Sequence, residues 1–185
     1  MSEIPAFLEG IGRWDYQEAH RQVSMLGEAS NITSEDLIKL LQCLPNVVTG
    51  YSDIYTVNVG KEVLIWKNYE GLVWALGESF RQILKRKKSL RHSNECWALV
   101  ENVCLYSQFG KGRESFTMLL GQYGGQDRIP TLLKLLDDGE VQGHALYALR
   151  LLGARQARAE AEGLLGSPRS WIRSEARKYL RKCAP

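Results

Sequence analysis

Proline is rare in this chain of 185 residues, with five occurrences, and no long uncharged apolar run is present. The longest candidate, residues 40–52, is interrupted by Pro45, Asn46 and Gly50, so it is too short to span a membrane. Residues 1–5 lack the basic patch and the apolar stretch that open a secretory signal. These absences predict a cytoplasmic protein that does not associate with membranes.

The sequence motifs of common enzymes and metal sites are missing as well. The four cysteines form no Cys-x-x-Cys pair, and His20, His92 and His144 each stand alone, without carboxylates at metal-ligand spacing. Neither a Gly-x-Ser-x-Gly nucleophile motif nor a Gly-x-x-x-x-Gly-Lys-Ser/Thr phosphate loop occurs. Residues 110–113, Gly-Lys-Gly-Arg, resemble an anion loop but lack its strand-to-helix context, which favours a turn between helices. We therefore expect buried free thiols, no metal, no cofactor and no enzymatic activity.

Helical spacing of apolar residues dominates what is present. Residues 14–26 place them at steps of three and four, which is one face of a helix. Thr33 or Ser34 is the expected cap of a second helix, which we expect to end at Pro45. Further helices are expected over residues 69–90, 95–109 and 116–123.

Residues 47–68 fit the helical pattern least. β-branched residues between Ile54 and Ile65, on either side of a Gly-Lys turn, are typical of a small hairpin. The alternative is a loop that leads into a helix starting near Lys61. Because an isolated two-stranded hairpin is marginally stable without a further element to cover it, we expect the loop and the helix.

The last third of the chain contains an internal repeat. Residues 128–153 place two apolar segments on either side of the turn 137–139, and residues 154–183 do the same around the turn 166–168. The pairs of corresponding positions in the second segments lie 31 residues apart and are Val141 and Ile172, Ala145 and Ala176, and Leu149 and Leu180. This spacing predicts a helix–turn–helix unit that occurs twice.

Residues 132–153 read Leu-Leu-x-Leu-Leu-Asp-Asp-x-x-Val-x-x-x-Ala-x-x-Ala-Leu-x-x-Leu-Gly, which resembles the HEAT repeat family and its bacterial HEAT-like relatives. Two positions depart from the family: Gln142 stands where an Arg is common, and Ser167 replaces the turn Asp of the second unit. The resemblance implies an all-α fold, a short α-solenoid of four to five antiparallel helix pairs. We expect it to form a single domain over residues 1–185, because one helix pair cannot bury its apolar face alone.

The net charge of +3 is made from alternating blocks. Residues 1–60 carry eight acids and three bases, whereas residues 145–185 carry nine bases and three acids. Two basic features are the candidate partner-binding residues: the row Arg169, Arg173, Arg177 and Arg181 on the last helix, and the cluster Lys85, Arg86, Lys87, Lys88 and Arg91 at the end of another helix. The alternatives are a solvated helix for the row, and for the cluster bases that complement the helix dipole.

The resemblance and the small size favour a protein-binding module that inhibits or neutralises one partner protein, as small bacterial immunity proteins do with a toxin. That partner would be acidic at the contact if the arginine row is used. The alternative is nucleic-acid binding, because some HEAT-like proteins are DNA glycosylases that hold phosphates with basic helices; the acidic first third opposes it. A third hypothesis is an enzyme that uses a carboxylate in a groove beside Trp66 or Trp74.

Overall fold

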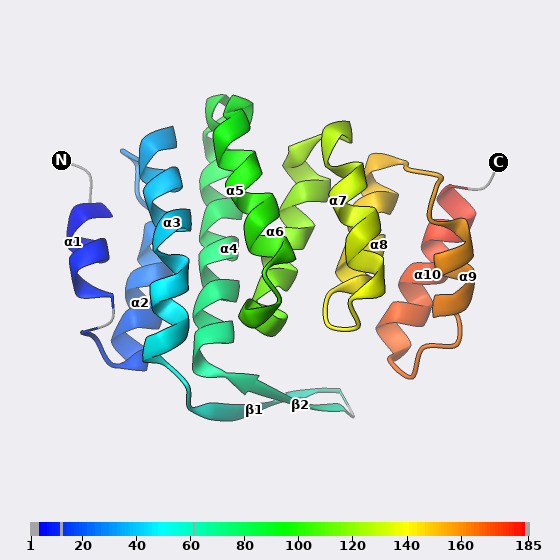
Figure 1. Ribbon diagram of the computed structural model, residues 1–185, viewed down its shortest axis with the longest axis horizontal. Coiled ribbons are helices and arrows are strands. Elements are labelled where there is room, and N and C mark those ends of the chain that lie inside the picture. Colours follow the sequence, from blue (N-terminus) through cyan, green and yellow to red (C-terminus); the bar gives the residue numbers. More distant parts are fainter. Residues whose placement is uncertain (1–3, 12, 61, 184–185) are drawn as a thin grey trace. The chain divides into compact units, whose positions relative to one another are not determined.

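The computed structural model describes residues 4–11, 13–60 and 62–183 (Figure 1). These residues form ten α-helices and one two-stranded antiparallel sheet, which confirms the predicted all-α class. The chain divides into two compact units, residues 1–116 and 117–185. The single domain expected over the whole chain therefore stays a prediction. No helix within the described residues combines the length and the apolarity that crossing a membrane requires.

The first unit consists of two rows of helices and a hairpin. Its elements are α1 (Ile4–Gly10), α2 (Tyr16–Leu26), α3 (Ser34–Gly50), β1 (Ile54–Val59), β2 (Glu62–Lys67), α4 (Asn68–Arg86), α5 (Asn94–Leu105) and the start of α6 (Arg113–Leu119), with 3-10 turns η1 (Lys88–His92) and η2 (Ser107–Gly112). Helix α3 packs on both α1 and α5, while α2 packs on α4 behind them (Figure 1). Buried side chains between the rows include Leu37, Leu40, Leu44, Leu72, Phe80, Ile83 and Val100.

Helix α3 starts where the sequence predicts and runs past the predicted end. Thr33 caps it: its Oγ1 accepts from the Asp36 backbone N–H at 3.2 Å, and its own N–H donates to the Asp36 carboxylate at 2.9 Å. The expected end at Pro45 is wrong, because the helix continues to Gly50. Proline removes one backbone donor, but burial of Val47 and of Tyr51 holds the last turn in place. The Tyr51 hydroxyl also donates to the Trp14 carbonyl at 3.0 Å.

The expected loop and helix over residues 47–68 are also wrong, because β1 and β2 form an antiparallel hairpin there. The helix expected to start near Lys61 begins at Asn68, and Lys61 itself lies outside the described residues. The hairpin is not isolated: the ring of Tyr55 lies 6.1 Å from that of Tyr16 on α2. Lys111 donates its Nζ to the Ile65 carbonyl at 2.9 Å. Helices therefore supply the cover that a two-stranded hairpin needs.

The second unit contains the two helix–turn–helix elements that the repeat predicts. They are α7 (Ile129–Lys134) with α8 (Gln142–Leu152), and α9 (Arg158–Leu164) with α10 (Ser170–Lys182), preceded or joined by η3 (Leu120–Gly124), η4 (Gln126–Arg128) and η5 (Leu135–Asp137). Helix α10 packs on both α8 and α9. Repeat positions such as Val141, Ala145 and Ala176 are fully buried. The helical-repeat prediction is confirmed in this unit, and the likeness to HEAT repeats stays a resemblance.

Two glycines outside the repeat pattern set the closest helix contacts of this unit. A Cβ on Gly121 would collide with the backbone of Ala148 on α8. A Cβ on Gly143 would collide with Trp171 and with Ile172 on α10. The small residues at both contacts let the helices approach closely.

Candidate functional site

The basic cluster at residues 85–91 is mostly engaged within its own unit. The Arg86 guanidinium donates to the carbonyls of Gly27 and Ala29, which lie between α2 and α3. Lys87 Nζ donates to the Ile32 carbonyl at 2.9 Å. These bases hold the α2–α3 connection and satisfy carbonyls that would otherwise lack a partner.

Of the three remaining members of the cluster, one binds a carbonyl and two are exposed. Arg91 Nε donates to the Leu84 carbonyl at 2.9 Å near the end of α4. Lys85 and Lys88 are exposed and have no partner within the described residues. Only these two members of the cluster are therefore available to a binding partner.

The arginine row on α10 is also split. Arg173 Nη1 donates to the carbonyls of Ser167 and Pro168, at 2.7 and 2.8 Å, and so closes the turn before the helix. Arg169 is the residue before the first turn and is half-buried. Arg177 and Arg181 are exposed and have no partner within the described residues. The structure thus leaves two free arginines, one turn apart, on an exposed face.

The one acid of α10 points away from that face. Glu175 is buried and pairs with Arg150 of α8, and its other oxygen lies 3.4 Å from Lys178 Nζ. It neutralises no charge at Arg177 or Arg181. The field at the end of this helix is therefore positive.

The loop at residues 110–113 holds an anion that belongs to the chain itself. The buried carboxylate of Glu70 accepts from the Lys111 backbone N–H at 3.1 Å and from the Lys67 backbone N–H at 2.8 Å. Gly110 has a φ of +50°, and a Cβ there would overlap Glu70. Because the Glu70 carboxylate occupies this loop, the loop serves as a turn between helices and requires no external anion.

No group of three or more His, Cys, Asp or Glu side chains suited to a metal ion occurs in the described part of the chain. The ring of His144 contacts that of Trp171 at a tilt of 45°, with ring centroids 4.7 Å apart. Burial, and secondarily the charge of Arg169, lowers the pKa of His144 to about 4. This histidine is therefore neutral at physiological pH and serves the α8–α10 contact.

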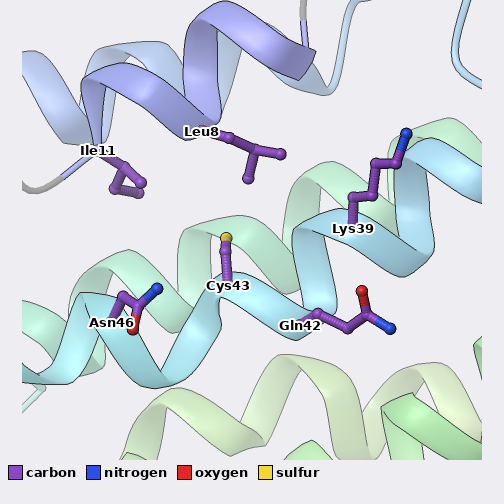
Figure 2. A pocket seen from close by; sticks show the side chains of 6 residues that line it. All are labelled: Leu8, Ile11, Lys39, Gln42, Cys43 and Asn46. Carbon is purple, nitrogen blue, oxygen red and sulfur yellow. The ribbon is translucent and has the colours of Figure 1, made fainter.

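A surface that the sequence did not mark lies on the outer face of α3. Its first hollow, about 370 Å³ in volume, lies between α1 and α3 and is lined by Leu8, Ile11, Lys39, Gln42, Cys43 and Asn46. Figure 2 shows Leu8 and Ile11 on one side and the four α3 side chains on the other. The lining combines apolar side chains with two neutral amides.

A second hollow, about 230 Å³, lies on the opposite side of Gln42, between α3 and α5. It is more apolar and is lined by Leu41, Gln42, Pro45, Leu99, Asn102, Val103, Tyr106 and Phe109. Tyr106, one of the lining residues, is itself exposed by 42%. The two hollows share Gln42, and together we call them the α3 surface.

Two titratable side chains of the α3 surface, Cys43 and Lys39, have shifted pKa values. Burial raises the pKa of the Cys43 thiol to about 11, and its Sγ donates to the Leu40 carbonyl at 3.0 Å. A protonated thiol is a weak nucleophile. The hydrogen bond that Lys39 Nζ donates to the Glu35 carboxylate, 2.8 Å away, raises the pKa of Lys39 above its usual value, so this side chain stays charged. The groove expected beside Trp66 or Trp74 is a different place: neither tryptophan lines either hollow, and no carboxylate is among the lining residues.

No protein-family model matches the chain, and no curated protein matches it. Among solved structures, the chain is similar to one described as "Designed armadillo repeat protein YIII(Dq)4CqI", with 16% sequence identity. The similarity covers 98% of this chain and 100% of that chain, with a TM-score of 0.36. A likeness this low carries no argument about function, which must come from the surfaces described above.

Proposed function

We propose that this chain is a non-enzymatic, cytoplasmic protein-binding module that inhibits or neutralises one partner protein, in the manner of a small immunity protein with HEAT-like repeats. The observation that carries the proposal is the α3 surface, where two neighbouring hollows share Gln42. Apolar side chains and neutral amides dominate both hollows, and charge is scarce. Interface cores have the same composition: aromatic and apolar residues are enriched there, and charged residues are depleted.

The shape of the α3 surface favours a protein over a small molecule. Both hollows are open to solvent along their length, whereas small-molecule sites enclose most of the ligand. A helix or loop of a partner can place one apolar side chain in each hollow and bridge Gln42 between them. The high pKa of Cys43 favours binding over nucleophilic chemistry at the same place.

The test is affinity purification from the native host with the parent chain and with Gln42→Arg. Gln42 is exposed, so the substitution leaves the core intact and places a long charged side chain between the hollows. We expect one partner protein to be retained by the parent and lost with Gln42→Arg, and the activity of that partner to fall when the parent is added. The matched control is Gln17→Arg, at an exposed position of α2 outside both hollows. Recovery of the partner with all three chains would overturn the assignment.

Nucleic-acid binding is the second candidate, because Arg177 and Arg181 are exposed and free of acid partners in the described residues. Two bases make few phosphate contacts, so the expected salt slope is shallow. A gel-retardation assay at low salt, comparing the parent with Arg177→Ala/Arg181→Ala, tests it. Retention of a nucleic acid by the parent, with a shallow salt dependence and loss in the double variant, would favour this candidate over the first.

A further inference from the structure

The two outer edges of the hairpin differ in what covers them. The Asn68 N–H donates to the Asp53 carbonyl at 2.7 Å, which fixes the alternation of the antiparallel ladder. Counting from this pair, the backbone groups of Ile54, Thr56 and Asn58 on β1 point outward, away from β2. On β2, those of Val63, Ile65 and Lys67 point outward in the same way.

The outer edge of β2 is protected by its own unit. Lys111 Nζ donates to the Ile65 carbonyl at 2.9 Å, and the Glu70 carboxylate accepts from the Lys67 N–H at 2.8 Å. Folded proteins protect free strand edges with lysines, charges or covering elements. The outer edge of β2 therefore has this protection, from Lys111 and from Glu70.

The outer edge of β1 has no such protection. The outward N–H and carbonyl groups of Ile54, Thr56 and Asn58 have no partner within the described residues. The strand Ile-Tyr-Thr-Val-Asn-Val contains no charged residue and no proline. A strand edge of this kind is a template for pairing with another chain.

The hairpin face that adjoins this edge is exposed and half apolar. Ile54, Val63 and Ile65 are exposed by 68%, 64% and 58%. The register places all three on one face, together with Thr56, Asn58 and Lys67. The opposite face carries Tyr55, which is held by Tyr16. Among the described residues of the exposed face, Lys67 carries the one charge, and it is cross-strand neighbour to Ile54.

We propose that the outer edge of β1 is a docking site for an extended segment of a partner protein, which joins the hairpin as a third strand. On the exposed face its side chains lie beside Ile54, Thr56 and Asn58 of β1, so apolar residues alternate with polar ones, and it carries an acidic residue at the Lys67 end. A residue paired with Ile54 lies two strand spacings from Lys67, about 10 Å, within reach of an ammonium and a carboxylate. The backbone supplies affinity and the alternate side chains supply selectivity.

The size of the edge argues against a second copy of this chain as the occupant. A specific interface buries about 1,200–2,000 Å² in total, and one pair of six-residue strands falls well below this. A partner protein that also contacts other surfaces of this chain can bury the area that the strand pair alone does not supply. The edge is separate from the α3 surface, so the two sites succeed or fail independently.

The probe is a displayed library of extended peptides, about eight residues long, in which β-branched residues alternate with randomised positions. We expect the selected peptides to carry an acid near one end and to slow amide exchange at Ile54, Thr56 and Asn58. Thr56→Pro removes one outward N–H and leaves the ladder to β2 intact, so it should weaken binding by about tenfold. Asn58→Pro should weaken peptide binding to a similar extent. Thr56→Val, which keeps the N–H, should bind the peptides as the parent does. Lys67→Gln should abolish the preference for an acidic residue in the selected peptides.

The controls separate this site from the rest of the molecule. Exchange at Tyr55 and Val57, whose amides face β2, reports that the hairpin stays folded in each proline variant. Gln42→Arg should leave peptide binding unchanged. The proposal is overturned if both proline variants bind as tightly as the parent, or if the selected peptides protect amides elsewhere. It is also overturned if raising the protein concentration alone protects these three amides, since a second copy would then be the occupant.

Discussion

The first unit joins its helices through individual polar contacts, and the second joins them through repeated small residues. In the first, Ser79 Oγ donates to the Val23 carbonyl at 2.7 Å, which ties α4 to α2. The buried Arg113 donates to the carbonyls of Gly110 and Cys104, at 2.8 and 3.2 Å. Each of these contacts occurs once and depends on two residues that are far apart in sequence or on an irregular turn.

In the second unit the same positions recur from one repeat to the next. Ala145 and Ala176 occupy equivalent places and are both fully buried. Outside the repeated positions, Gly121 and Gly143 also bring neighbouring helices together. The Arg150–Glu175 pair links α8 to α10 beside this contact. Apolar burial supports both units; single buried polar contacts add to the helix contacts of the first, and repeated small residues set those of the second.

Removal of a core side chain from the second unit should have the largest effect. Leu149→Ala deletes a fully buried leucine of α8 and should lower the free energy of unfolding by about 2–5 kcal/mol, because a cavity remains. Chemical denaturation measures it, and hydrogen exchange should show the loss concentrated in residues 117–185. Leu165→Ala, at an exposed leucine, is the matched control and should cost about 0.5 kcal/mol or less. Equal losses of protection in both units would break the comparison.

Removal of a polar link from the first unit comes next. Arg113→Met keeps much of the buried volume but leaves the carbonyls of Gly110 and Cys104 without these donors, which should cost about 2–3 kcal/mol. Denaturant titration of the purified variant measures the loss. Arg13→Met makes the same change at an exposed position and should be nearly neutral. If the two variants unfold alike, buried polar contacts do not support the first unit.

Acidification should weaken the second unit through His144. The pKa of this residue is lowered to about 4 in the folded chain from the ordinary 6.5, so the unfolded chain binds its proton first. The contribution to stability is complete above pH 6.5 and is lost as the pH falls towards 4. Between about pH 7 and about pH 4.5 the parent should lose on the order of 2 kcal/mol more than His144→Phe, which keeps a ring against Trp171. Parallel pH dependences would contradict the buried, neutral state of His144.

The smallest effect concerns the arginine row on α10. Arg173→Ala removes the two hydrogen bonds to Ser167 and Pro168 and should cost about 1 kcal/mol. Arg177→Ala, one turn later on the exposed face, should change stability by less than about 0.5 kcal/mol. Thermal melts of both variants sharpen the division of the row into a structural and a free half. A larger loss at Arg177 would reverse that division.

Helical periodicity predicted the elements whose apolar residues recur within one segment, such as α2, α4, α8 and α10. It did not predict α1, a helix of seven residues held by the burial of Ile4 and Phe7 against the rest of the unit. It also missed the hairpin, because the stabilising contacts of Tyr55 and Ile65 come from Tyr16 and Lys111, far away in the sequence. Contacts between distant residues decide these two regions.

The candidate surfaces show the same limit. The basic residues stood out by charge alone, and the sequence did not reveal that carbonyls between α2 and α3 occupy Arg86 and Lys87. The α3 surface carried one signal: residues 40–52 contain no charge, although Gln42, Pro45 and Asn46 among them are exposed. An uncharged stretch on an exposed helix face indicates an interface. The sequence alone could not indicate it, because it does not show which of these residues face outward.

The hydroxyl of Tyr179 on α10 donates to the Ala154 carbonyl at 2.6 Å and accepts from the Ala157 N–H at 3.1 Å. One side chain near the end of the chain thus closes the connection between α8 and α9, more than twenty residues earlier in synthesis. During translation this bend has no internal partner for either backbone group until Tyr179 has emerged from the ribosome. The second unit should therefore acquire its final packing only after Tyr179 has been synthesised and is free to fold back onto this bend.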